Sequence, residues 1–240
     1  MNDRLRLGPP DTKSSRFELS QLESIGGRPS RRGVLRHVAQ IVGGASALTL
    51  SAGSARAGKI RPTPSQVAGP YYPKEKPSEA DWNLLSVGNG APPMGVPLEL
   101  RGTVTNRSGR PIADAHVEIW QADNQGIYDH PRDSERAGFD HRFQGYGALD
   151  TDADGQYRFL TLMPVPYGSR PPHIHVTIRR VGAEALTTQL YLKGHPDNGR
   201  DGLFALMMYP GQEKLMIDPQ DAALDNGMRG KSAHFDFVVF

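Results

Sequence analysis

The sequence predicts an all-β protein, an antiparallel β-sandwich with an extended N-terminal arm and long loops that carry function. From residue 98 onward, short segments alternate apolar and polar side chains with period two. Clusters of Gly, Pro, Asn and Asp separate these segments, and no stretch after residue 57 shows sustained helical periodicity. Many short strands joined by turns favour two sheets whose inner faces form one core.

The composition excludes several kinds of site and partner. The 240 residues contain no cysteine, which excludes disulfides, thiolate metal sites and cysteine nucleophiles. The first 57 residues hold nine basic and four acidic side chains, which leaves 19 basic and 22 acidic ones, a net charge of −3, for the remainder. The overall charge of +2 therefore does not indicate a nucleic-acid partner.

Residues 1–57 are predicted to be a leader and signal peptide of the twin-arginine (Tat) type. Arg31 and Arg32 precede the apolar segment 38–50, and Ala55-Arg56-Ala57 has the form of a cleavage site. The alternatives are a membrane anchor and an amphipathic surface helix, but the apolar segment is shorter than the ~20 residues that a spanning helix needs and it ends in a cleavage site. No later segment is apolar enough to span. We expect export through the Tat pathway to the periplasm or the exterior.

The mature chain divides into two further parts. Residues 58–97 contain little alternation and are expected to form an extended arm, which includes Gly69-Pro70-Tyr71-Tyr72-Pro73. Residues 98–240 are expected to form the β-sandwich. Its predicted strands cover 98–105, 115–121, 157–160, 173–178, 186–192 and 234–240. Residues 129–149 lack a strand pattern and are expected to be a long loop, and loops of that length are often functional.

The segment His173-Ile174-His175 carries the strongest chemical signal. Alternate side chains of a strand share a face, so Ile174 and Val176 point to the core while both histidines point to the opposite face. A lone histidine would more simply be structural or exposed. Two imidazoles side by side behind a Pro-rich loop instead favour a pair of metal ligands.

The neighbouring residues narrow the choice of metal. A cupin would have a glutamate a few residues after the histidine pair, where this chain has Arg179 and Arg180. No Asp or Glu lies at short spacing for a site of two histidines and one carboxylate. Tyr167 does precede His173 by six residues, and a phenolate is a hard anionic oxygen ligand that suits ferric iron.

Several motifs in order resemble the intradiol ring-cleavage dioxygenases, the family of protocatechuate 3,4-dioxygenase and catechol 1,2-dioxygenase. The resemblance spans about residues 65–192. The matching segments are Gly69-Pro70-Tyr71-Tyr72, residues 117–123 with Gly126-Ile127-Tyr128, Pro164 to Tyr167, Arg170 to His175, and Thr188-Gln189-Leu190-Tyr191. Several motifs in the right order are far more specific than any one of them.

The resemblance implies a non-haem Fe(III) centre and a role for each matching residue. The implied iron ligands are Tyr128, Tyr167, His173 and His175. Substrate would be a catecholic compound, cleaved with O2 between its hydroxylated carbons to a cis,cis-muconate. Tyr167 would also accept a catechol proton, Arg170 would stabilise developing negative charge, and Gln189 would bond Arg170 or orient oxygen. The implied pocket walls are Gly69, Pro70, Tyr72 and Arg170.

The chain departs from the family pattern in two places. Gly168-Ser169 replace a longer segment that some protocatechuate enzymes have, which predicts a wider pocket or a different substrate. The 58–97 arm is too short for the helical dimerisation region of catechol 1,2-dioxygenases, although a homo-oligomer is compatible with the resemblance. The alternative function is a non-catalytic β-sandwich protein that binds a small molecule.

Overall fold

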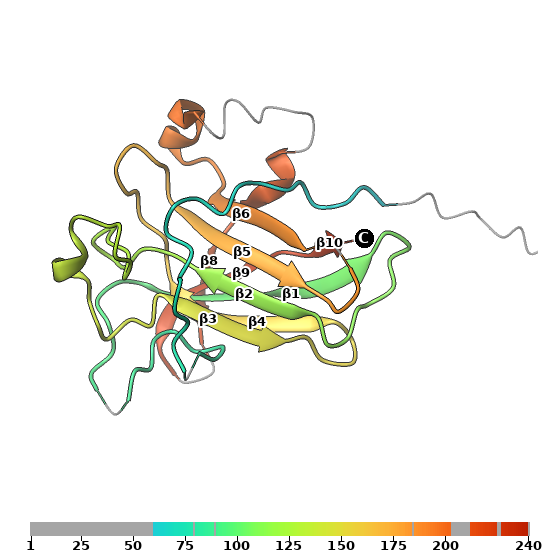
Figure 1. Ribbon diagram of the computed structural model, residues 1–240, viewed down its shortest axis with the longest axis horizontal. Coiled ribbons are helices and arrows are strands. Elements are labelled where there is room, and N and C mark those ends of the chain that lie inside the picture. The colour runs from blue at the N-terminus through green and yellow to red at the C-terminus, as the bar shows by residue number, and fades with distance from the viewer. Residues whose placement is uncertain are drawn as a thin grey trace, which may run out of the picture. The chain divides into compact units, whose positions relative to one another are not determined.

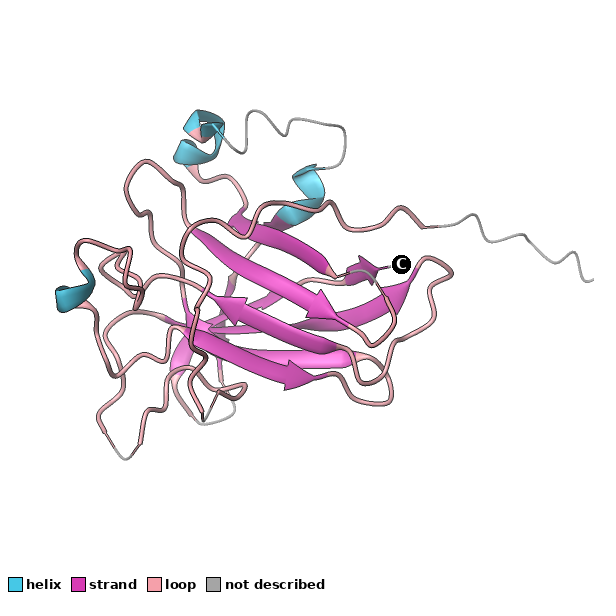
Figure 2. Ribbon diagram, viewed as in Figure 1, coloured by secondary structure: helices cyan, strands magenta, loops and turns pink. Residues whose placement is uncertain are grey.

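Strands dominate the part of the chain that the structure describes. The computed structural model describes residues 60–239 except 79, 89, 184, 203–211 and 225–226. The predicted leader and signal, residues 1–57, lie outside the described residues. Two five-stranded sheets contain the strands (Figure 1, Figure 2). The predicted β-sandwich is therefore confirmed.

The first sheet is built around the longest strand, β1. The strand order is β10-β1-β9-β8, and β4 also pairs with β1. The bounds are β1 Pro97–Asn106, β4 Gln156–Leu162, β8 Gln220–Ala223, β9 Arg229–His234 and β10 Phe237–Val239.

The second sheet has the order β3-β2-β5-β6-β7. The bounds are β2 His116–Trp120, β3 Tyr146–Asp150, β5 His173–Arg179, β6 Leu186–Leu192 and β7 Met216–Ile217. Among the described residues, three short 3-10 helices lie between strands: η1 Arg136–Gly138, η2 Pro196–Arg200 and η3 Gln212–Leu215. No helix in the described residues is long and apolar enough to cross a membrane.

Both sheets are mixed and not purely antiparallel as expected. Strand β1 runs parallel to β9 and β10, and β6 runs parallel to β7. The segment 234–240, predicted as one strand, is divided by an irregular stretch at 235–236, and on either side of it β9 and β10 pair with β1 in the same register. In this stretch the Phe235 amide donates to the Arg101 carbonyl at 2.9 Å. Gly102 makes this close approach feasible, since an added Cβ would overlap the Phe235 carbonyl oxygen.

Strand β3 lies inside the segment 129–149 that was expected to be a loop throughout. It pairs antiparallel with β2, with Tyr146 opposite Trp120. The alternation is weak because one position requires glycine. A Cβ at Gly147 would lie 2.5 Å from Leu84 Cδ1 and 2.7 Å from the Asp81 carbonyl oxygen. Because this position must be glycine, β3 lacks the apolar–polar alternation by which a strand is predicted from sequence.

The alternation of β5 separates a core face from an outer face. Ile174, Val176 and Ile178 are fully buried in the main core with residues of the first sheet such as Leu100 and Phe159. A second buried cluster contains Trp120, Ala122, Tyr128 and Tyr146, with Tyr71, Tyr72 and Tyr167 packed against it. This second cluster therefore gathers aromatic residues from the strands, the loops and the arm.

The arm bonds to strands of both sheets before it crosses the second one (Figure 1). The Thr63 amide donates to the Val238 carbonyl of β10 at 2.8 Å, and the Gln66 amide donates to the Thr187 carbonyl of β6 at 2.7 Å. Further on, Tyr72 hydrogen bonds to Glu118 of β2. The arm thus brings its tyrosines to the face of the sheet that carries the histidine pair.

Candidate metal centre

The two histidines of β5 meet on the outer face of the second sheet. His173 and His175 are 3% and 1% exposed, and their Nε2 atoms are 3.2 Å apart. The spacing follows from the strand period, because residues two apart share a face. The predicted juxtaposition of the two imidazoles is thus present in the fold.

Each imidazole is oriented in a different way. His173 Nδ1 lies 2.7 Å from the Pro171 carbonyl oxygen, so this nitrogen carries the proton and Nε2 keeps its lone pair. His175 stacks on Trp120, its cross-strand neighbour, with ring centroids 4.7 Å apart and an interplanar angle of 8°. The Nδ1 atom of His175 is buried without a hydrogen-bond partner among the described residues.

Two tyrosines from separate loops approach the same point. The rings of Tyr128 and Tyr167 have centroids 5.0 Å apart and are nearly perpendicular. Tyr167 is 5.3 Å from His173 and Tyr128 is 6.2 Å from His175 by ring centroid. The structure therefore brings the four predicted ligands, Tyr128, Tyr167, His173 and His175, into one cluster.

Gly126 permits the two tyrosine loops to approach each other. Its φ is +82°, and an added Cβ would lie 2.6 Å from the Pro166 carbonyl oxygen and 3.4 Å from Tyr167 Cβ. A side chain at this position would therefore force the Tyr128 and Tyr167 loops apart.

The electrostatics of the cluster keep both imidazoles neutral. Burial, followed by the charge of Arg170, lowers the pKa of His173 to about 4. Burial, followed by the proximity of His173, lowers the pKa of His175 well below its usual value. Neutral imidazole is the form that binds metals.

The tyrosines fit a hard cation. The Tyr128 hydroxyl is buried without a hydrogen-bond partner in the described structure. Burial, with a contribution from Tyr167, raises the pKa of Tyr128 well above its usual value, so only a strong Lewis acid would ionise it. The described residues contain no cluster of three or more His, Cys, Asp or Glu side chains that could hold a metal. Two phenol oxygens and two imidazole nitrogens are the donor set present, and this set suits ferric iron.

Arg170 lies beside the cluster in a network of hydrogen bonds. Its Nη2 group donates to Gln189 Oε1 at 2.7 Å, and Gln189 Nε2 donates to the Val67 carbonyl of the arm. The guanidinium also pairs with the buried carboxylate of Asp201 and donates to the Tyr191 hydroxyl. The sequence predicts the proximity of Arg170 and Gln189. It contains no signal for Asp201, which is 31 residues from Arg170 in a polar segment.

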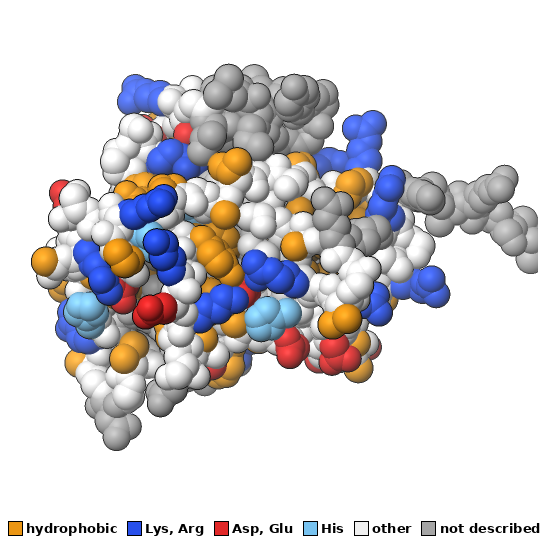
Figure 3. Space-filling model, viewed as in Figure 1, with side chains coloured by type: hydrophobic (Ala, Val, Ile, Leu, Met, Phe, Trp, Pro, Cys, Tyr) orange, Lys and Arg blue, Asp and Glu red, His pale blue; other side chains and the backbone are white. Residues whose placement is uncertain are grey.

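A cleft of about 400 Å³ opens in front of Tyr167 and Arg170. Its lining consists of Tyr71, Gly126, Asp133, Ser134, Glu135, Tyr167, Gly168, Ser169 and Arg170. Tyr71 stacks on Tyr128 with centroids 4.7 Å apart, so this arm tyrosine closes one side of the metal cluster. The face shown in Figure 3 has widely spread Lys and Arg side chains and fewer acidic ones.

The three arm residues predicted as pocket walls occupy different places. A Cβ at Gly69 would lie 3.4 Å from His175 Cε1, and Pro70 is exposed. The Tyr72 hydroxyl donates to Glu118 at 2.9 Å, and its ring packs against Trp120. Tyr72 therefore contacts the indole on which His175 stacks. The substrate contacts of Gly69, Pro70 and Tyr72 stay predictions, whereas Tyr71 is the arm tyrosine that lines the cleft.

Glu118 is the buried centre of a partly exposed ionic cluster next to Trp120. Its carboxylate accepts hydrogen bonds from Lys76, Arg179, Tyr72 and Tyr146. Burial alone would raise the pKa of Glu118, but the hydrogen bonds from Lys76, Tyr146 and Arg179 lower it to about 2. The cluster fastens the arm to strands β2, β3 and β5, and so holds it over the aromatic face of the sheet.

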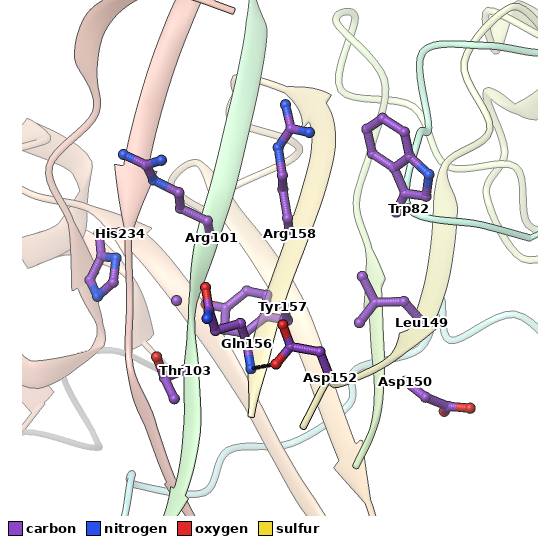
Figure 4. Close-up of a pocket in the computed structure, with 11 residues that line it drawn as sticks. Trp82, Arg101, Thr103, Leu149, Asp150, Asp152, Gln156, Tyr157, Arg158 and His234 are labelled. Atoms are coloured by element: carbon purple, nitrogen blue, oxygen red, sulfur yellow. Dashed lines mark hydrogen bonds between the residues drawn. The ribbon is translucent and has the colours of Figure 1, made fainter. Parts of the chain in front are cut away.

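A larger groove, with a volume of about 660 Å³, lies elsewhere, along residues of β1 and β4 in the first sheet and the end of β3. Arg101 of β1 and Arg158 of β4 extend from neighbouring strands along it, near Trp82 (Figure 4). Arg158 pairs with Glu99 and lies 5.3 Å from the centre of the Trp82 ring. Arg158 is thus already engaged by Glu99 and Trp82, and none of the four predicted metal ligands lines the groove.

Comparison with known proteins decides the family. The sequence model of a family described as Dioxygenase matches residues 67–240. The chain belongs to the dioxygenase family. Its relatives include the protocatechuate 3,4-dioxygenase beta chain of Burkholderia cepacia, 33% identical over 180 residues that cover 71% of this chain and 75% of the relative. They also include catechol 1,2-dioxygenase of Acinetobacter baylyi, 31% identical over 189 residues.

The coverage of these dioxygenases is unequal. The match covers 71% of this chain but only 58% of the Acinetobacter enzyme. Among solved structures, the dioxygenase domain of a dioxygenase carbohydrate-binding fusion from Streptomyces sp. SirexAA-E is 34% identical, with a TM-score of 0.58, and the match covers 75% of this chain and 98% of that one. The chain is thus a homologue of the intradiol dioxygenases, and the resemblance inferred from its motifs is confirmed.

Proposed function

We propose that the chain is a non-haem Fe(III) dioxygenase that cleaves a catecholic ring between its two hydroxylated carbons to give a cis,cis-muconate-type product. The observation that carries the proposal is the convergence of Tyr128, Tyr167, His173 and His175, with a Tyr128 oxygen that has no hydrogen-bond partner among the described residues. The named relatives, which include a protocatechuate 3,4-dioxygenase chain and catechol 1,2-dioxygenases, support the same chemistry.

The four side chains would hold the iron, and the rest of the site would act on the substrate. When bound, ferric iron draws electron density from a catecholate and makes a ring carbon reactive toward O2. Tyr167 lines the cleft, and its phenolate oxygen would accept a proton from a catechol hydroxyl. The stack of Tyr71 on Tyr128 would exclude water from one side of the cluster.

Arg170 would stabilise negative charge on the substrate, because this residue lines the cleft and its guanidinium is a permanent cation. Gln189 holds Nη2 of Arg170 and is itself held by the Val67 carbonyl, so the cation is positioned before substrate enters. The volume of about 400 Å³ lies within the usual range for small-molecule pockets, roughly 300–1,000 Å³. The spread of basic side chains on the face in Figure 3 would favour the approach of anionic catechols.

Colour and oxygen uptake test this function. Tyrosinate-to-Fe(III) charge transfer should tint purified protein red-brown, with iron near one per chain. Oxygen uptake is measured with catechol, protocatechuate, hydroxyquinol and substituted catechols, and product spectra distinguish intradiol from extradiol cleavage. Arg170→Ala should keep iron and colour but lose turnover. A colourless protein without iron after iron-replete expression would instead favour a non-catalytic binding protein.

We also propose export through the Tat pathway to the periplasm or the exterior. The support is the sequence pattern of Arg31 and Arg32 before an apolar segment and Ala55-Arg56-Ala57. The test is cell fractionation of the full chain and of an Arg31→Lys, Arg32→Lys double variant. The full chain should appear outside the cytoplasm and the variant should remain inside. Equal export of both chains would contradict the proposal.

A further inference from the structure

We propose that Asp201 is a positioning residue for the reaction, which holds the Arg170 guanidinium at a fixed place and angle in the cleft. The inference rests on the proposed function and names a residue outside all the predicted motifs. Asp201 is 2% exposed and faces Arg170 across the site. It would act through Arg170, without touching substrate or iron.

The pairing of the two residues is bidentate. Nε of Arg170 donates to Asp201 Oδ1 at 2.9 Å, and Nη2 donates to Oδ2 at 3.1 Å. Nη2 also donates to Gln189 Oε1 at 2.7 Å and to the Tyr191 hydroxyl at 3.2 Å. A bidentate pair fixes the plane of the guanidinium as well as its position.

This arrangement divides the guanidinium into a held edge and an available end. Asp201, Gln189 and Tyr191 take up the Nε and Nη2 groups. These hydrogen bonds between described residues do not include Nη1, the remaining end of the guanidinium, and Arg170 lines the cleft together with Tyr167. The held edge thus leaves donors available where substrate charge would develop.

The fold fixes both partners of the pair. The Arg170 amide donates to the Tyr167 carbonyl at 2.9 Å, so a tight turn ties Arg170 to a predicted ligand. Asp201 directly follows the 3-10 helix η2, and Asn198 of that helix donates to the Leu192 carbonyl at the end of β6 at 2.8 Å. Strand β6 also carries Gln189 and Tyr191. The guanidinium is therefore held to β6 in two ways, directly by Gln189 and Tyr191 and indirectly by Asp201 through η2.

The pair is too buried to act as an ordinary surface salt bridge. The side chains of Arg170 and Asp201 are 14% and 2% exposed. Surface pairs contribute little, whereas removal of one partner of a buried pair leaves an uncompensated charge. Burial alone would lower the pKa of Arg170, but the hydrogen bonds to Asp201 hold it above its usual value. Loss of the Asp201 charge would also make the cleft more positive.

The test compares Asp201→Asn and Asp201→Glu with a matched control, Glu99→Gln. Glu99 is 6% exposed and pairs with Arg158 on the first sheet, where Nε and Nη2 of Arg158 both contact Oε2 of Glu99, at 2.7 and 2.6 Å. We expect Asp201→Asn to lower kcat by about 10- to 100-fold, with KM unchanged or lower and with iron content and the visible band retained. Asp201→Glu should recover part of the loss, and Glu99→Gln should leave kcat unchanged.

A second measurement does not depend on turnover. In the iron-free wild-type protein, the Arg170 Nε–H signal, assigned by its absence in Arg170→Lys, should exchange with solvent at least 10-fold more slowly than those of exposed arginines. The same signal should become fast in Asp201→Asn. If the variants fail to fold, the wild-type signal alone decides, since fast exchange there would overturn the inference.

The outcomes separate this inference from the proposed function. Wild-type protein without iron or ring cleavage would refute the function, while slow exchange at Arg170 would still support the pair. Active wild-type protein with an Asp201→Asn variant of parental kcat would refute the positioning role alone. A higher KM together with lost iron in Asp201→Asn would show general damage to the site and would also overturn the assigned role.

Discussion

The imidazole of His175 lies flat against the indole of Trp120, with ring centroids 4.7 Å apart and planes within 8°. His173 is oriented instead by a hydrogen bond from Nδ1 to the Pro171 carbonyl. His175 has no such bond, because its Nδ1 is without a partner among the described residues. Stacking therefore replaces the hydrogen bond that usually orients a metal-binding histidine.

Replacement of Trp120 by leucine should weaken iron binding. The smaller side chain would leave His175 free to rotate, and we expect iron affinity to fall by about 10-fold, a loss typical of residues that orient a ligand. Competition with a chelator measures this affinity. Phe159→Leu is the control, because Phe159 is equally buried in the main core and should lose stability without loss of iron affinity. Equal iron loss in both variants would contradict the role of the stack.

Tyr128→Phe should abolish the visible band and most iron binding, yet leave the iron-free protein as stable or more stable. The reason is that the Tyr128 hydroxyl is buried and has no hydrogen bond to any residue that the structure describes, so its removal eliminates a desolvation cost. Iron analysis, absorption spectra and urea denaturation of the iron-free protein measure these effects.

Tyr157→Phe is the matched control for Tyr128→Phe. Its hydroxyl is also buried, but it donates to the Phe235 carbonyl at 2.6 Å. The variant should lose about 1–3 kcal/mol of stability, because a buried carbonyl loses its partner, and it should keep iron and colour. A Tyr128→Phe protein that retained the band would show that Tyr128 does not bind iron.

The sequence predicts the sandwich and the ligand cluster because both depend on local periodicity and order. The two-residue repeat of β5 separates Ile174 and Val176 from the histidines without any knowledge of the rest of the fold. Asp201 and β3 could not be found in this way. Asp201 reaches Arg170 only through the path of η2, and β3 has a glycine where Leu84 and the Asp81 carbonyl leave no room for a side chain.

The sequence also could not show which of the two arm tyrosines, Tyr71 or Tyr72, lines the cleft. Tyr71 and Tyr72 are adjacent in a turn of the arm, and their side chains contact different partners. The motif alone does not decide which one faces the cleft. The bond from Tyr72 to Glu118 settles it, because it directs Tyr72 to the ionic cluster and leaves Tyr71 on Tyr128.

Glu118 should make the stability of the protein depend on pH in the acid range. Its pKa is lowered to about 2 from 4.5, so the unfolded chain binds a proton first as the pH falls. The contribution is present above pH 4.5 and is lost as the pH falls toward 2, and it is on the order of 3 kcal/mol. Urea denaturation of iron-free protein at pH 6 and pH 3 should show this loss in wild type and a smaller one in Glu118→Gln.

Asp221→Asn is the control for the acid titration. Asp221 pairs with Lys231, but its side chain is 94% exposed, so the pair should contribute little at either pH. Its denaturation curves should follow those of the wild type at both pH values. If Glu118→Gln also followed the wild type, the carboxylate would not fasten the arm by its charge.

Gly126→Ala should separate the effect of backbone strain from the effect of a blocked contact. Alanine at φ +82° costs about 1–2 kcal/mol, and its Cβ would in addition lie 2.6 Å from the Pro166 carbonyl oxygen. Because Pro166 adjoins Tyr167, the clash should push the Tyr167 loop away from Tyr128 and reduce iron occupancy. Gly168→Ala is the control, since Gly168 has φ +53° with nothing within 4 Å of an added Cβ. It should show the strain alone, as a lower Tm with full iron content, whereas full iron content in Gly126→Ala would mean that the two loops can move apart without breaking the cluster.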